Sequence, residues 1–239
     1  MTIPLRTKGS VRGEATRLRI VEAAIDLFGE HGYEHTSTRD IAARAGVNTP
    51  ALQYYFENKE GVYRACAEHI AACAWARLAP VVDQAMRLLE GNARVNALID
   101  AFIHLHETLG DCLFMVPNES RRLFFAGEPL GHDPAIGPEI VRKRIHDPLH
   151  TVAAKLIARI TGIAADDPVT TIRAVSLYGQ LMMFHLKPRA ALSLLGWPAF
   201  DVEKRQLIVA VLRGQTQVLL KGWSAAAPVI GSRRTQARK

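Results

Sequence analysis

Residues 36–59 read TSTRDIAARAGVNTPALQYYFENK, and this stretch determines how the chain is expected to fold. Ser37, with Asp40 three residues later, gives the pattern that caps the start of a helix. Gly46 stands where a tight turn needs a left-handed backbone. Asn48 is a favourable N-cap for the next helix, and Pro50 falls in the first turn of that helix. The stretch therefore predicts two short helices, at 38–45 and 48–56, joined by a glycine turn.

The second of these helices has an inner and an outer face. Leu52 and Phe56 are four residues apart, so both side chains point toward a core. The outer face holds small or polar side chains, which can enter a DNA major groove about 12 Å wide. This arrangement is typical of a helix-turn-helix whose second helix reads DNA. The outer side chains are Thr49, Ala51, Gln53 and Tyr54.

Helical periodicity also dominates the rest of the chain, and hardly any segment alternates like a strand. An amphipathic helix over residues 15–31 precedes the motif and ends at Gly32. Loops are expected at 127–138 and 187–201, where Gly and Pro are frequent, the second with room for one helical turn. Further helices are expected at 59–80, 81–89, 93–109, 119–126, 138–161, 168–186 and 202–223.

These patterns predict an all-α protein with two domains between basic tails. The first domain is a three-helix helix-turn-helix DNA-binding unit, and the second is a larger helical ligand-binding and dimerisation unit. The expected divisions are a flexible tail at 1–13, the first domain at 14–64, the second at 65–224 and a flexible tail at 225–239.

Composition is that of a globular protein, and it favours an anionic partner. The sequence pI is near 9.6 and the formal net charge is +7, which suits nucleic acid. Three cysteines in 239 residues make no disulfide framework. The first residues are polar, and the most apolar stretch, 70–82, is too short to cross a bilayer. We expect a cytoplasmic protein with no membrane partner.

The motif stretch resembles the TetR family of transcription regulators. The likeness lies in Ala45-Gly46-Val47, Leu52, Tyr55-Phe56 and Lys59-Glu60, together with residues 38–42. It implies that Thr49 and Gln53 face bases and that Arg39 can read one, arginine being suited to guanine and glutamine to adenine. Other matching positions would contact the DNA backbone, although Tyr55 is also spaced for partial burial. The DNA-binding residues expected together are Ser37, Thr38, Arg39, Asn48, Thr49, Ala51, Gln53, Tyr54, Tyr55 and Lys59.

Two later stretches, 147–162 and 195–201, resemble the subgroup of this family typified by CecR. An Arg-Glu pair often precedes Glu-Pro in that subgroup, whereas Phe124 and Phe125 precede Glu128-Pro129 here, which suggests a more apolar pocket. A regulator of this design needs a cavity between helices, although each candidate could instead be core or surface. The candidate ligand-binding residues are His104, Met115, Arg121, Phe125, Tyr178, Met182, Met183 and His185.

The family forms its dimer from two late helices, which match 168–186 and 202–223 here. An apolar series on the second of them is wide enough for a partner, although burial within one subunit would also explain it. The series is Leu207, Ile208, Val211, Leu212, Val218 and Leu219.

The function expected is a ligand-responsive transcriptional regulator, most commonly a repressor in this family. It would bind palindromic double-stranded operator DNA as a homodimer and change affinity when a small-molecule effector binds. No enzyme motif is found, and no cofactor is expected. Two alternatives stay open: a DNA-binding protein without a ligand, and a metal-responsive regulator. The second would use Cys66, His69 and Cys73, which share one helix face.

Overall fold

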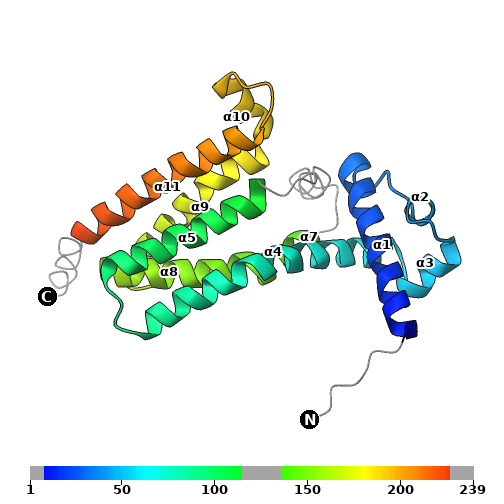
Figure 1. The fold of residues 1–239 in the computed structure, drawn as a ribbon, viewed down its shortest axis with the longest axis horizontal. Helices are drawn as coiled ribbons and strands as arrows, with labels where there is room; N and C mark the ends of the chain where they lie inside the picture. The colour runs from blue at the N-terminus through cyan, green and yellow to red at the C-terminus, as the bar shows by residue number, and fades with distance from the viewer. Residues whose placement is uncertain (1–7, 115–135, 227–239) are drawn as a thin grey trace, which may run out of the picture. The chain divides into compact units, whose positions relative to one another are not determined.

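The structure is a computed structural model that describes residues 8–114 and 136–226, with side chains from residue 12 onward. All the regular elements in those ranges are helices (Figure 1). The all-α prediction is therefore confirmed. The described residues divide into two compact units: 8–73 with 136–144, and 74–114 with 145–226.

The first unit is built on the helix-turn-helix. It contains α1 (Lys8–His31), α2 (Thr38–Arg44), α3 (Thr49–Tyr55), the first part of α4 (Lys59–Glu90) and α7 (Ile136–Val141). Helix α1 begins at Lys8, so residues 8–13, which were expected in a flexible tail, are helical. The assignment of domains to 14–64 and 65–224 stays a prediction.

One apolar core holds the helices of the first unit together. Ile20 of α1, Ile41 of α2, Leu52 of α3 and Val62 of α4 are all fully buried in it. Helix α7, far away in sequence, rests on the same core through its isoleucines at 136 and 140. Helix α7 thus covers part of the core of the motif, a contact that no local sequence pattern predicted.

The second unit is a helical bundle. It contains the later part of α4, α5 (Val95–Phe114), α8 (Asp147–Thr161), α9 (Pro168–Leu186), α10 (Pro188–Leu195) and α11 (Val202–Ala225). Helix α11 packs against α5, α8 and α9, and α5 also packs against α8 and α9. Figure 1 shows α5, α9 and α11 side by side.

Three expectations about the helices need correction. Helix α4 runs unbroken through Pro80, which is exposed; the buried Leu78, Val81 and Val82 on either side hold the helix despite the lost hydrogen bond. The helix expected at 138–161 is interrupted by a π-helical turn, η2 (Arg142–His146). The connection at 187–201 contains an eight-residue helix, α10. Within the described ranges, no helix is long and apolar enough to span a membrane.

Candidate nucleic-acid interface

Helix α2 starts at the capping box that the sequence predicted. The Ser37 hydroxyl oxygen accepts from the Asp40 amide at 3.2 Å, and the Ser37 amide donates to the Asp40 carboxylate at 3.2 Å. The hydrogen bonds from the Ser37 side chain and backbone lower the pKa of Asp40. A short helix is thereby fixed at its N-terminal end, where Thr38 is half-buried and Arg39 is exposed.

The turn after α2 also has the predicted chemistry. Gly46 has a φ of 64°, a left-handed conformation that favours glycine. The Val47 amide donates to the Ala42 carbonyl at 3.0 Å, so the chain turns back on the end of α2. The Asn48 side chain then caps α3 by accepting from the Ala51 amide at 2.8 Å.

Helix α3 presents part of the expected face to solvent. Leu52 is fully buried on its inner side, while Tyr54 is 84% exposed and Gln53 is exposed. Tyr55 is half-buried and packs against the core, as its spacing suggested. Thr49 and Ala51 are half-buried at the start of the helix, and Asn48 is exposed. Outward polar side chains on a helix clamped from behind are what a groove-reading helix requires.

Lys59 is held by the turn between α1 and α2, a feature that the sequence did not suggest. Its ammonium donates to the Glu34 carbonyl at 3.4 Å and lies 4.2 Å from the centre of the Tyr33 ring. The charge is therefore fixed in place at the start of α4. A cation in a fixed position suits a contact with a DNA phosphate.

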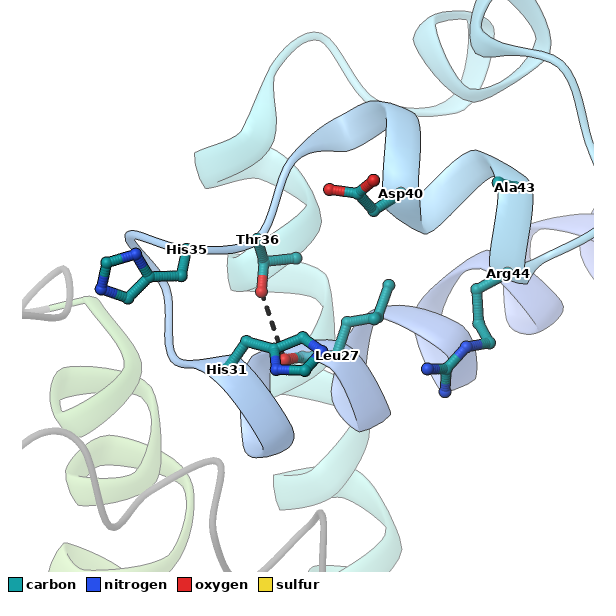
Figure 2. Close-up of a pocket in the computed structure, with 7 residues that line it drawn as sticks. All are labelled: Leu27, His31, His35, Thr36, Asp40, Ala43 and Arg44. Carbon is teal, nitrogen blue, oxygen red and sulfur yellow. Dashed lines mark hydrogen bonds between the residues drawn. The ribbon is translucent and has the colours of Figure 1, made fainter.

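An open hollow of about 740 Å³ lies between the last turns of α1 and helix α2 (Figure 2). Its lining includes Thr36, whose hydroxyl donates to the Leu27 carbonyl at 3.2 Å. Arg44 at its edge is paired with Glu30 at 3.2 Å. The other lining residues are Leu27, His31, His35, Asp40 and Ala43. None of the candidate effector residues that the structure describes lines this hollow.

The candidate effector residues that the structure describes have mixed surroundings. Tyr178 donates its hydroxyl to the Leu149 carbonyl at 3.3 Å, and burial raises the pKa of its phenol. His104 and Met183 are exposed, and Met182 and His185 are half-buried. Met115, Arg121 and Phe125 lie outside the described residues. The effector site stays a prediction.

A buried histidine beside Tyr178 was missed by the sequence analysis. His106 is 2% exposed, its ring forms a cluster with the rings of Phe102 and Tyr178, and its Nε2 lies 2.9 Å from the Leu177 carbonyl. Because a carbonyl only accepts, Nε2 carries the proton. Burial lowers the pKa of His106, against the opposing effect of this hydrogen bond. Nothing in the apolar helix pattern around His106 indicated that its side chain would be buried beside Tyr178.

The three residues proposed for a metal site do not converge. Cys66 is buried and its thiol donates to the Val21 carbonyl at 3.5 Å, and burial raises the pKa of this thiol. His69 lies 2.9 Å from the Glu22 carboxylate, and Cys73 is exposed, 3.6 Å from His69. In residues 8–114 and 136–226, no group of three or more His, Cys, Asp or Glu side chains is placed to hold a metal ion. The metal-responsive alternative therefore has no site among these residues.

Comparison with known proteins gives matches to both parts of the chain. The family model described as "Bacterial regulatory proteins, tetR family" matches residues 20–66. A second, "HTH-type transcriptional dual regulator CecR, C-terminal domain", matches residues 119–223. The chain is similar to the HTH-type transcriptional dual regulator CecR of Shigella flexneri, with 32% identity over 90% of this chain and 96% of that protein. It is also similar to the class A tetracycline repressor of Escherichia coli, with 40% identity over 31% of this chain and 35% of that protein.

Solved structures share the fold. A putative transcriptional regulator from Pseudomonas aeruginosa PAO1 superposes with a TM-score of 0.63 at 16% identity, covering 90% of this chain and 94% of that one. A TetR-like regulator from Rhodococcus sp. RHA1 gives a TM-score of 0.60 at 16% identity, covering 92% and 100%. The matches are to transcriptional regulators rather than to enzymes. With its capped, outward-facing α3 and a relative matched along nearly its whole length, the chain belongs to the TetR family and is a DNA-binding transcriptional regulator.

Proposed function

We propose that this protein binds a palindromic operator as a homodimer, represses the adjacent genes, and changes its DNA affinity when a small molecule fills its second unit. The observation that carries the proposal is helix α3, whose buried Leu52 fixes it to the core while Gln53 and Tyr54 stay outside. A DNA-binding role of this kind also requires that the protein act in the cytoplasm.

Base reading would fall to α3 and the start of α2. Gln53 is exposed at mid-helix and can bond the N6 and N7 positions of adenine. Arg39 is exposed in the first turn of α2 and can grip guanine with both ends of its guanidinium. Thr38, Asn48, Tyr54, Tyr55 and Lys59 would hold the duplex in register through its phosphates. Ser37 would contribute to DNA binding mainly by capping α2.

Dimerisation is supported by two exposed apolar stripes in the second unit. On α9, Ile172, Val175, Met183 and Leu186 are exposed at a helical spacing. On α11, the apolar series predicted from sequence divides in two. Ile208 and Leu212 are buried within the subunit, whereas Leu207, Val211, Val218 and Leu219 are exposed.

Glycines stand within both stripes. A Cβ added at Gly179 of α9 or Gly214 of α11 would meet nothing of this chain within 4 Å. Exposed apolar residues in a continuous stripe indicate an interface, and small residues within it allow helices to approach closely. Paired stripes on two neighbouring helices fit a four-helix interface between two copies.

The response to a ligand would travel along chain segments shared by the two units. Helix α4 begins in the first unit and continues without a break into the second. The segment from α7 through η2 into α8 also crosses from one unit to the other. A ligand shifts DNA affinity through such segments only if it binds the two states unequally.

The DNA-binding part is tested by selecting duplexes from a random pool with the purified protein and measuring affinity by fluorescence anisotropy. A palindrome should emerge. Arg39→Ala should then cost about 1–3 kcal/mol on the selected duplex and little on an unrelated one. Lys59→Ala should weaken binding to both alike and flatten the salt dependence. Failure to select any sequence would overturn the proposal.

The ligand response and the direction of regulation need separate measurements. A thermal-shift screen against a compound panel should give a compound that both stabilises the protein and changes its affinity for the selected duplex. Binding to DNA that stays the same with every compound that binds the protein would favour a regulator without an effector. The relative in Shigella flexneri is named a dual regulator, so a reporter gene behind the selected duplex is needed to test for repression.

A further inference from the structure

We infer that the N-terminal turns of α1 form a second DNA contact, in which Arg12 and Arg17 bind phosphates beside the end of α3. We call this surface the α1 flank and define it by Arg12, Gly13, Thr16 and Arg17. The inference rests on the proposed binding of α3 in the major groove. None of the four residues was among those expected to touch DNA.

The α1 flank lies against the C-terminal end of the reading helix. A Cβ added at Gly13 would be 3.6 Å from the Tyr55 hydroxyl, so α1 passes close to that side chain. The Tyr55 ring in turn meets the exposed Tyr54 ring edge to face, with 5.2 Å between centres. One turn further along, the Arg17 guanidinium lies over the Phe56 ring, 5.2 Å from its centre. These contacts place the start of α1 beside the last residues of α3.

The charges of the flank are available to a ligand. Arg12 and Arg17 are both exposed. The ring of Phe56 holds the Arg17 guanidinium in position without neutralising it. The Thr16 hydroxyl forms its hydrogen bond within α1, where it donates to the Arg12 carbonyl at 3.0 Å. The first turn of α1 has no acidic residue.

Two exposed acids must be considered beside the flank: Glu14, which lies within it in sequence, and Glu57, which follows Phe56. A helix advances by about 100° per residue, so Glu14 projects from the side of α1 roughly opposite to Arg12. Glu14 is three residues before Arg17, so these two side chains lie on the same side of α1. Arg12 is therefore the flank residue with the least opposing charge on its own side.

The partner that fits such a surface is the DNA backbone. A helix in the major groove has a wall of phosphates on each side, and cations beside the end of that helix face one of these walls. Arginine binds a phosphate through two parallel hydrogen bonds, which suits a guanidinium already held by an aromatic ring. Such contacts are independent of sequence and release counterions, so they should appear in the salt dependence of binding.

The experiment measures affinity of the full chain for a random-sequence duplex of about 30 base pairs over a range of salt, with Arg12→Gln and Arg17→Gln. Each lost phosphate contact should lower the slope of log K against log salt by about 0.9, or about 1.8 for the two copies in a dimer. The ratio of wild-type to variant affinity should thus fall roughly twelvefold between 50 and 200 mM salt. Arg12→Lys should restore most of the slope.

The matched control is Arg87→Gln, which removes the same charge from an exposed arginine of α4 in the second unit. The inference is overturned if the slopes for Arg12→Gln and Arg17→Gln equal the slope for Arg87→Gln or for the wild type, while the melting temperatures stay unchanged. Gln53→Ala on a selected duplex separates the two proposals. If this variant loses sequence preference while the flank variants keep the wild-type slope, the flank inference alone fails. If no variant changes binding, the placement of α3 in the groove fails as well.

Discussion

Replacing Val218 by aspartate should break the dimer while leaving the subunit folded. Val218 is 71% exposed on the α11 stripe, so the isolated subunit loses little packing when it is changed. In a twofold interface the same side chain is buried twice, once in each copy. The predicted damage therefore falls on association rather than on folding.

The size of the effect follows from the exposed area. Burying a whole valine side chain gives about 1.5–3 kcal/mol, so the exposed part of Val218 gives roughly 1–2 kcal/mol per copy and roughly 2–4 kcal/mol per dimer. Because each 1.4 kcal/mol changes a dissociation constant tenfold, the dimer dissociation constant should rise roughly 30- to 1,000-fold. An unpaired carboxylate at the interface adds a further cost, so these figures are a lower bound.

Sedimentation velocity over about a hundredfold range of dilution measures this constant directly. The variant should also bind a palindrome no better than one half-site, because two readers are no longer held together. Val95→Asp is the control, an exposed valine at the start of α5 on neither stripe. A Val218→Asp protein that sediments as the wild type does, or a Val95→Asp protein that dissociates equally, would refute the reasoning.

Three further outcomes are expected. Asn48→Ala removes the cap of α3 and should lower the free energy of unfolding by about 1 kcal/mol in urea titrations. Gln53→Ala should change base preference by about 1–3 kcal/mol at one position of a selected duplex, while the melting temperature stays as in the wild type. His106 is buried with a lowered pKa, so below the ordinary histidine pKa the unfolded chain binds a proton that the folded chain does not. Stability should therefore fall as pH drops from about 7.5 to 5.5 and fall less in His106→Gln, and equal losses in both proteins would contradict this.

The DNA-binding motif was predictable because its determinants are local. The capping box at Ser37, the left-handed Gly46 and the cap at Asn48 each act within four residues, so their spacing alone specified the turn. The burial of Leu52 and Phe56 followed from helical periodicity. Helix α9 begins and ends at the residues predicted, because Asp167 caps it just before Pro168.

Proline and glycine led to wrong predictions of loops or breaks in two situations. In one they stand at the ends of a helix, and in the other the packing of neighbouring residues outweighs the helix-breaking effect of proline. Pro188 and Gly196 suggested a loop, but they stand at the first position and at the left-handed end of α10. Pro80 suggested a break, but buried neighbours on both sides keep α4 continuous. The start of α1 was missed because its first turns are polar and lack an apolar stripe.

The surroundings of individual side chains depend on contacts distant in sequence. Nothing near Lys59 in the sequence indicated that Tyr33 and Glu34 hold its ammonium. The same is true of His106, whose partner carbonyl at Leu177 is 71 residues away. The sequence left the α11 series as one wide apolar surface, and only burial within the subunit separated its two faces.

Helix α7 has a practical consequence for hybrid regulators. Because Ile136 and Ile140 rest on the same core as the helix-turn-helix, a fragment cut after residue 73 would leave an apolar area of that core bare to water. A chimera that joins these reading helices to another protein's sensor should therefore carry residues 136–144 along with them. A fusion at a single junction in α4 would instead leave the foreign sensor to supply the missing cover.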